Sequence, residues 1–220
     1  MSTYVLMRIL ESAPRRYDLG IRLLALGRLG KAYRRLASRV ELGYRVLDVG
    51  CGTGALTLPI ALRGATVKGI DVNPEMLEIA RRRVSAAGLA DCVELAEVGV
   101  AELDEEQGGS YDAVASGLCF SELSEDELSY ALRQAARILK PGGLLLVADE
   151  VRAHSALGRI AQLAIRVPLA ALAYIVTQQT TRPIANLPAR VSDAGLCVES
   201  IRAGPLGGLC ELVARKPGGA

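Results

Sequence analysis

Three glycines directly after a short apolar segment constrain this chain more than any other feature. Residues 45–55 read Arg-Val-Leu-Asp-Val-Gly-Cys-Gly-Thr-Gly-Ala, the pattern of a buried strand that turns sharply into a helix. Gly50, Gly52 and Gly54 lack the Cβ atoms that would keep a ligand away from the backbone N–H groups of the turn. We expect Thr53 to cap a helix over 55–63, whose first amides favour an electron-rich partner. The run therefore predicts a site for a nucleotide-like cofactor.

Two carboxylates discriminate among the cofactors that bind at such turns. Asp48 precedes the first glycine by two residues, where it would repel a pyrophosphate but attract the ammonium and sulfonium of S-adenosylmethionine. Asp71 closes the apolar segment 66–71, and a carboxylate at that place accepts both hydroxyls of a ribose. The pair favours S-adenosylmethionine. Residues 50–55 also fit the loose dinucleotide fingerprint, so a nicotinamide-dependent oxidoreductase is the alternative from another class.

The chain resembles the class I S-adenosylmethionine-dependent methyltransferases in three motifs that occur in order. Residues 47–54 match the first motif of that family, residues 69–74 its second, and residues 139–144 the turn before its fifth strand. The resemblance covers about 46–147 and is broadly to the quinone and phospholipid branch. A weaker one, at residues 4–18, is to a group found with corrinoid proteins, which makes a corrinoid protein a candidate partner.

The expected fold class is α/β with a mostly parallel sheet, because strand and helix patterns alternate after residue 45. We expect strands at 45–49, 66–71, 93–98, 111–117, 143–149, 196–202 and 207–215. The last two are too close for a crossover helix and should form an antiparallel hairpin. The resemblance implies a Rossmann-like seven-stranded sheet in the order 3-2-1-4-5-7-6, with the last strand antiparallel and helices on both faces.

Helix boundaries are predicted by capping residues. Asn73 followed by Pro74 predicts a helix start, and Gly88 its end. Residues 124–127 form a capping box that should start a helix running to Leu139, and the Pro-Gly-Gly turn at 141–143 should end it.

The resemblance implies cofactor contacts from several turns. The residues concerned are Asp48, Gly50, Gly52, Gly54, Asp71, Val72, Val100, Ala101, Ser116 and Tyr17. Asp48 and the first two glycines should face the methionine part, Asp71 the ribose and Val72 the adenine. Relatives commonly place an acidic residue where this chain has Val100, so backbone contacts from Val100 and Ala101, or Glu102 as a surrogate, should replace it. Ser116 and the two residues after it should line the cleft near the methyl group.

Catalytic residues are hard to recognise in this chemistry. The sulfonium already activates the methyl group, so the protein needs mainly to align a nucleophile, and the transfer itself requires no metal. His154, the only histidine, and Tyr17 are weak candidates. A surface position without a catalytic role is favoured for His154, whereas core packing explains Tyr17 as well as a contact with the cofactor does. Cys119 is best interpreted as a small buried residue.

The remaining composition bears on localisation. The five cysteines are scattered without a Cys-x-x-Cys pair, which predicts reduced thiols and a cytoplasmic protein. No signal peptide is visible near residues 4–10, and the apolar segment 160–176 is interrupted by Arg166 and Pro168, which makes it too short to span a bilayer.

Two segments lie outside the expected sheet. Residues 1–44 form a basic arm, with nine arginines and lysines before residue 40, and we expect it to act as a helical lid beside the domain 45–220. The insertion 154–188 is apolar on nearly all sides. It should cover a hydrophobic acceptor pocket, form a homodimer interface or bind to a membrane surface.

These observations favour one function and leave alternatives. The favoured one is S-adenosylmethionine-dependent methyl transfer to a small or lipid-like acceptor. An RNA methyltransferase using the basic arm, a non-catalytic cofactor-binding partner protein, and the oxidoreductase remain as alternatives, with nucleic acid the less favoured substrate.

Overall fold

One seven-stranded sheet forms the centre of the molecule. The computed structural model describes residues 28–152, 183–203 and 208–218. Its strands are β1 (Arg45–Val49), β2 (Thr66–Asp71), β3 (Val93–Glu97), β4 (Tyr111–Gly117), β5 (Leu139–Val151), β6 (Cys197–Ala203) and β7 (Gly208–Arg215). They follow the order β3-β2-β1-β4-β5-β7-β6, with β7 antiparallel to both of its neighbours. The expected fold class, order and final hairpin are confirmed.

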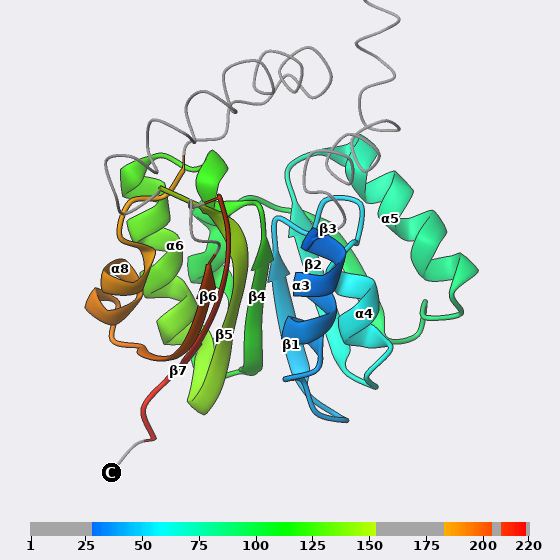
Figure 1. Cartoon of the computed structure of the whole chain (residues 1–220). Coiled ribbons are helices and arrows are strands. Elements are labelled where there is room, and N and C mark those ends of the chain that lie inside the picture. Colours follow the sequence, from blue (N-terminus) through cyan, green and yellow to red (C-terminus); the bar gives the residue numbers. More distant parts are fainter. Residues whose placement is uncertain (1–27, 153–182, 204–207, 219–220) are drawn as a thin grey trace, which may run out of the picture.

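Helices cover both faces of this sheet. Figure 1 shows α3 (Arg28–Ala37) and α4 (Thr57–Ala61) on one side, and α6 (Glu125–Ile138) and α8 (Leu187–Asp193) on the other. The helix α5 (Pro74–Ala86) lies against β2 and β3, and the short 3-10 turns η1 (Val100–Glu105) and η2 (Phe120–Glu122) follow β3 and β4.

Side chains alternate between two apolar cores as a strand pattern requires. Val46 belongs to the core under α3 and α4, and its neighbour Leu47 to the core under α6 and α8. At the carboxyl ends of the central strands, polar side chains take over these buried positions: Asp48 on β1, Ser116 on β4 and Asp149 on β5 are all fully buried. The apolar core therefore gives way to polar chemistry at one edge of the sheet.

The predicted caps are confirmed. The Asn73 side chain accepts hydrogen bonds from the N–H groups of Glu75 and Met76, and α5 ends just before Gly88. Ser124 and Glu127 form the expected capping box, with the Ser124 N–H donating to Glu127 Oε2 at 2.8 Å.

Two local predictions were wrong. Thr53 does not cap the helix after the glycine turn, because α4 begins only at Thr57 and the Thr53 hydroxyl instead accepts a hydrogen bond from Arg83 at 2.9 Å. The helix α6 already ends at Ile138, and the Pro-Gly-Gly turn that we expected to end it lies within β5 rather than before that strand. The pairing of β4 with β5 shifts from Tyr111 opposite Leu139 to Ala113 opposite Leu144, so the turn is accommodated as an irregularity in the strand.

Ion pairs join the helix α3 and the turn that follows it to the β6–β7 edge of the sheet. Arg35 forms a two-pronged pair with Glu211 on β7, and Arg39 pairs with Glu199 on β6 at 2.6 Å. Glu199 also pairs with Arg215. Two arginines of the basic arm are thus neutralised by the edge hairpin instead of forming an open cationic surface.

Several predictions concern residues outside the described ranges. Tyr17, His154 and most of the insertion 154–188 belong to them, although Ile184 pairs with Val151 and residues 187–188 begin α8. All five cysteines are free. Within residues 28–152, 183–203 and 208–218, no helix has the length and apolarity that crossing a membrane requires, and no three His, Cys, Asp or Glu side chains are grouped to hold a metal ion.

Candidate functional site

The glycine turn joins β1 to α4. Every second residue in it, from Gly50 to Gly54, has a left-handed backbone conformation. The φ angles of Gly50, Gly52 and Gly54 are +67°, +51° and +78°. A Cβ on Gly50 would lie under 3.0 Å from the side chain of Cys119, closer than real Cβ atoms come. Gly52 is different, since the nearest atom to its Cβ position is Asp71 Oδ2 at 3.9 Å. The turn is tightly packed at Gly50 and open to a ligand at Gly52.

Asp71 holds this turn in place. Its Oδ2 accepts a hydrogen bond from the Gly52 N–H at 2.7 Å, and its Oδ1 accepts one from the Asn73 N–H at 2.8 Å. A carboxylate offers about four acceptor positions, so both oxygens retain capacity for hydroxyl donors. The structure brings Asp71 and the glycine turn together, and the ribose contact stays a prediction.

Asp48 is a fully buried carboxylate with one free oxygen. Its Oδ2 accepts a hydrogen bond from the Thr57 hydroxyl at 2.6 Å, whereas Oδ1 has no hydrogen-bond partner among the described residues. Burial raises the pKa of Asp48 to about 7, with a hydrogen bond from Thr57 acting against burial and the charge of Asp71 acting with it. Buried polar atoms without a partner are rare in native proteins, and this one indicates a missing donor.

An apolar platform lies at the ends of β2 and β3. Val72 is 71% exposed, which is unusual for a valine, and a Cβ on Gly99 would lie 3.1 Å from its Cγ1. Val100 packs partly on the core and Ala101 is exposed. Glu102, the suggested surrogate, uses its Oε2 to accept the Gly99 N–H at 3.0 Å. The platform suits a flat aromatic ring.

The end of β4 is strained and closely covered. Ser116 is fully buried, and its hydroxyl has no hydrogen-bond partner within the part of the chain that the structure describes. Leu118 has a φ of +62°, a left-handed conformation that a bulky residue rarely adopts. Gly117 lies against the Tyr33 ring of α3. Strain of this kind is concentrated at functional sites.

Gly117→Ala should loosen α3 from the sheet. Its Cβ would lie 2.7 Å from Tyr33 Cζ, and overpacking of this kind lowers the free energy of unfolding by about 1–3 kcal/mol. Urea denaturation measures the loss. The control is Gly30→Ala, in the helix α3 that also carries Tyr33. It should not destabilise the protein, because its Cβ would meet only Arg34 Nη1, at 3.9 Å. Adding Tyr33→Leu to Gly117→Ala should recover part of the loss, and fully additive losses would contradict the contact.

Sequence reasoning missed two carboxylates that the fold brings to the same edge. Asp149, at the end of β5, accepts hydrogen bonds from the N–H groups of Glu150 at 2.7 Å and Ser121 at 3.2 Å. Burial raises its pKa to about 6 against those hydrogen bonds. Glu122 on η2 is exposed, yet the protein around it, followed by the charges of Asp149 and Asp71, raises its pKa to about 7. A signal existed for Asp149, because it directly follows the apolar run 144–148 as Asp48 follows 46–47.

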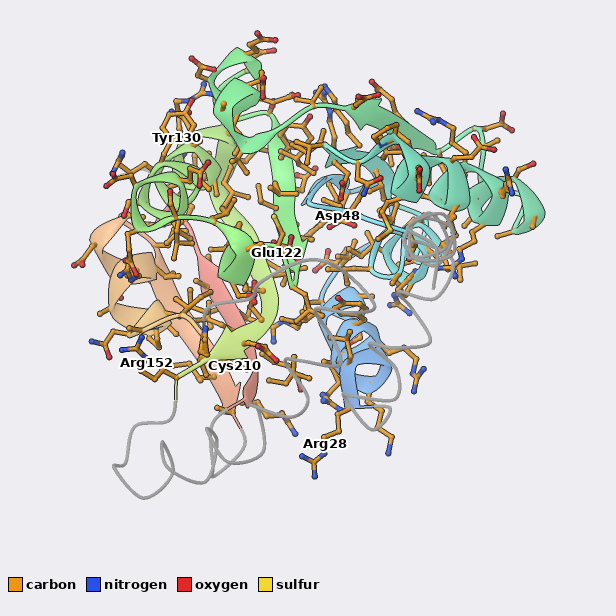
Figure 2. All side chains as sticks on the ribbon, turned by 90° about the horizontal axis from the view of Figure 1, so that it is seen from above. Arg28, Asp48, Glu122, Tyr130, Arg152 and Cys210 are labelled. Atoms are coloured by element: carbon orange, nitrogen blue, oxygen red, sulfur yellow. The ribbon has the colours of Figure 1, made fainter. Side chains whose placement is uncertain are left out.

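Figure 2 looks from above onto the carboxyl ends of the parallel strands. It shows Glu122 and Asp48 over the middle of the sheet in this view, whereas Arg28, Tyr130 and Arg152 lie towards the periphery. The candidate site is therefore formed by the carboxyl ends of β1, β2, β4 and β5 together with the glycine turn and η2.

The sequence of residues 46–143 matches the family described as Methyltransferase domain. Residues 46–143 therefore form a methyltransferase domain, which agrees with the resemblance to the class I S-adenosylmethionine-dependent methyltransferases. The match contains the first two motifs, all but the last residue of the third, and the half of the site with Asp48, the glycine turn and Asp71. The cofactor of this family is S-adenosylmethionine.

Individual relatives carry methyltransferase names. The methyltransferase GfsG of Streptomyces halstedii is 35% identical over 165 residues, which are 74% of this chain and 56% of that protein. The ubiquinone biosynthesis O-methyltransferase of Xanthomonas axonopodis pv. citri is 37% identical over 123 residues, 55% of this chain and 49% of that one. The chain thus spans about half the length of the curated relatives it matches.

Solved structures share the fold. A geranyl diphosphate methyltransferase in complex with S-adenosylmethionine aligns with a TM-score of 0.65 at 14% identity, covering 85% of this chain and 84% of that chain. The cyclase SpnF aligns with a TM-score of 0.69 at 22% identity, covering 86% and 81%. At these identities the likeness concerns the fold, which supports more than one function.

The residues of this domain fit S-adenosylmethionine. The free Asp48 oxygen needs a donor or a cation, Gly52 leaves open space beside Asp71, and Val72 presents an uncovered apolar surface. These features lie in sequence along β1, the glycine turn and the end of β2, which matches a ligand with a cationic end, a ribose and an adenine.

Proposed function

We propose that this protein transfers the methyl group of S-adenosylmethionine to a small or lipid-like acceptor. The observation that carries the proposal is the free oxygen of the buried Asp48 beside a glycine turn that Asp71 holds open. A buried carboxylate oxygen without a hydrogen-bond partner costs free energy, and a ligand with an ammonium or sulfonium group would supply the missing positive charge.

Each part of the site has a role in this reaction. The cofactor, when bound, supplies a methyl group on a positively charged sulfur. Asp48 would attract the cationic end, Asp71 would orient the ribose and Val72 would cover the adenine. Ser116 and Leu118, at the end of β4, would line the path along which the acceptor approaches. The protein contributes mainly alignment, which can account for about 7–11 kcal/mol of a reaction barrier.

The nature of the acceptor is suggested by relatives and by charge. Several relatives are named ubiquinone biosynthesis O-methyltransferases, which supports a small aromatic or lipid-like acceptor. An RNA substrate is less well supported, since Arg35 and Arg39 are engaged by Glu211 and Glu199 and do not offer charge to phosphates. Because this fold also occurs in SpnF, whose name is that of a cyclase, a second candidate is a protein that binds the cofactor without transferring its methyl group.

Calorimetry with S-adenosylhomocysteine tests the proposal directly. We expect clear heat of binding with this ligand and none with NADH. Asp71→Asn should weaken binding about tenfold or more, because hydrogen bonds to a charged group are worth about 1.5–3 kcal/mol. Asp91→Asn is the control, since Asp91 is exposed and precedes β3 at the opposite edge of the sheet. Heat with NADH alone would overturn the proposal, and binding without methyl transfer to any quinol, phenol or amine would support the second candidate.

A further inference from the structure

The start of η1 lies between the Val72 platform and the helix α6. A Cβ on Gly99 would lie 3.1 Å from Val72 Cγ1, so the backbone at this residue borders the platform. From the other side, the Tyr130 hydroxyl of α6 donates a hydrogen bond to the Ala101 carbonyl oxygen at 3.1 Å. Val100, between these two residues, packs partly on the core under α6 and α8. Residues 99–101 are therefore held by α6 on one side and border the platform on the other.

Tyr130 lies outside the candidate site. In the view of Figure 2 it lies towards the periphery, whereas Asp48 lies over the middle of the sheet. The Tyr130 ring packs partly on the core under α6 and α8, and its hydroxyl reaches the backbone of η1. A residue at this place can influence the cofactor only through η1, which makes it a candidate positioning residue.

The side chains at the start of η1 offer few polar groups to a base. Val100 and Ala101 are apolar, and Glu102 uses its Oε2 to accept the Gly99 N–H at 3.0 Å. We therefore expect the backbone to make the polar contacts with the base. A peptide group cannot be turned by a change of side-chain rotamer, so its direction depends on the contacts that hold η1 in place.

The other end of η1 is also bound to α6. Arg137 donates from Nη2 to the carbonyl oxygens of Leu103 at 2.9 Å and Glu106 at 2.7 Å. Arg137 comes two helical turns after Tyr130, so the two side chains extend from the same face of α6. The helix thus holds η1 at both ends, and the Tyr130 contact is the one beside the platform.

We propose that Tyr130 is a positioning residue for recognition of the base of the cofactor. Its hydroxyl holds the Ala101 carbonyl and thereby fixes the backbone of residues 99–101 against Val72. This inference rests on the proposed function and deepens it, because it assigns the discrimination of adenine from other purines to a backbone segment that α6 holds in place. Rigid hydrogen-bonding groups reject a base that leaves them unpaired, and a loosened segment can adapt to it.

Two ligands that differ only in the purine test this without knowledge of the acceptor. S-Inosylhomocysteine carries a carbonyl oxygen and a ring N–H where S-adenosylhomocysteine carries an amine and an unprotonated ring nitrogen. Calorimetry should show that the wild-type protein binds S-adenosylhomocysteine more tightly. Tyr130→Phe keeps the ring and removes only the hydroxyl. It should weaken S-adenosylhomocysteine binding about threefold to tenfold, the range expected for one hydrogen bond, and reduce the ratio of the two affinities about threefold or more.

The matched control is Ser129→Ala. Ser129 precedes Tyr130 on α6, and its hydroxyl donates to the Glu125 carbonyl oxygen of the same helix at 2.8 Å, so the variant also removes one hydroxyl hydrogen bond but none to η1. Both affinities should stay unchanged in it. The inference is wrong if the wild-type protein binds the two ligands equally, or if Tyr130→Phe leaves their ratio unchanged, as a general loosening of α6 would. Failure of the wild-type protein to bind S-adenosylhomocysteine would instead overturn the proposed function itself.

Discussion

Gly50→Ala will disrupt both the fold and the site. Its Cβ would lie under 3.0 Å from the Cβ and Sγ of Cys119, and the φ of +67° disfavours any side chain. Left-handed backbone costs about 1–2 kcal/mol for a residue with a Cβ, and overpacking adds about 1–3 kcal/mol. We therefore expect the free energy of unfolding to fall by about 2–5 kcal/mol, and S-adenosylhomocysteine binding to be lost. Urea denaturation and calorimetry measure the two effects.

Gly52→Ala separates the clash from the backbone strain. Gly52 has a similar φ of +51°, but its Cβ would meet only Asp71 Oδ2 at 3.9 Å. The stability loss should therefore be limited to about 1–2 kcal/mol. Binding should still be impaired, because the added methyl group fills space beside the Asp71 carboxylate. Equal stability losses in the two variants would show that contact with Cys119 does not constrain the turn.

Asp48→Asn should stabilise the free protein at pH 8 while it weakens cofactor binding. The asparagine can still accept the Thr57 hydrogen bond, but it carries no buried charge. One pKa unit corresponds to about 1.4 kcal/mol, and the pKa of Asp48 is raised from 3.8 to about 7. We expect a gain of about 1–3 kcal/mol in the free energy of unfolding at pH 8. Affinity for S-adenosylmethionine should fall about tenfold or more, because the attraction to its positive charges is lost.

The contribution of Asp48 to the free energy of unfolding depends on pH. The raised pKa means that folding favours the protonated form of Asp48, so its stabilising contribution is complete below about pH 4 and is lost as the pH rises through about 7. Thermal melts between pH 5 and 8 should thus decline less in Asp48→Asn than in the wild-type protein. A steeper decline in the variant would contradict the assignment.

Asp112→Asn is a control that should change the free energy of unfolding in the opposite direction. Burial acts to raise the pKa of Asp112, but hydrogen bonds from the Arg45 N–H and from Lys140 outweigh it, and the pKa is lowered. Its stabilising contribution is present above the unfolded pKa and is lost as the pH falls through the folded one. Asp112→Asn should therefore destabilise the protein at pH 8, where Asp48→Asn stabilises it.

The parts of the fold that depend on local pattern could be predicted from the sequence. The glycine turn, the Asn73 cap and the Ser124 capping box each place their determinants within a few residues, and the family resemblance supplied the strand order. Thr53 was misassigned because three left-handed glycines delay the helix, which a propensity argument does not register. The Pro-Gly-Gly turn was placed before β5, since a strand irregularity depends on its pairing partner.

For the site as well, the residues with a local sequence signal could be predicted and the others could not. Asp48 and Asp71 each end an apolar run next to a turn, so the sequence marks them. Glu122 sits in a short 3-10 turn without such a signal, and its proximity to Asp149 follows from which face each strand end presents. The left-handed conformation of Leu118 is likewise imposed by tertiary packing and has no local signature.

The ion pair between Arg35 and Glu211 determines where this domain can be cut for expression as a separate fragment. The family match begins at residue 46, yet a fragment cut there would discard α3, leave Glu211 without Arg35, and uncover the small alanine side chains against which α3 rests. A transplanted domain should therefore start no later than residue 28, because α3 and the hairpin of β6 and β7 are joined by this ion pair.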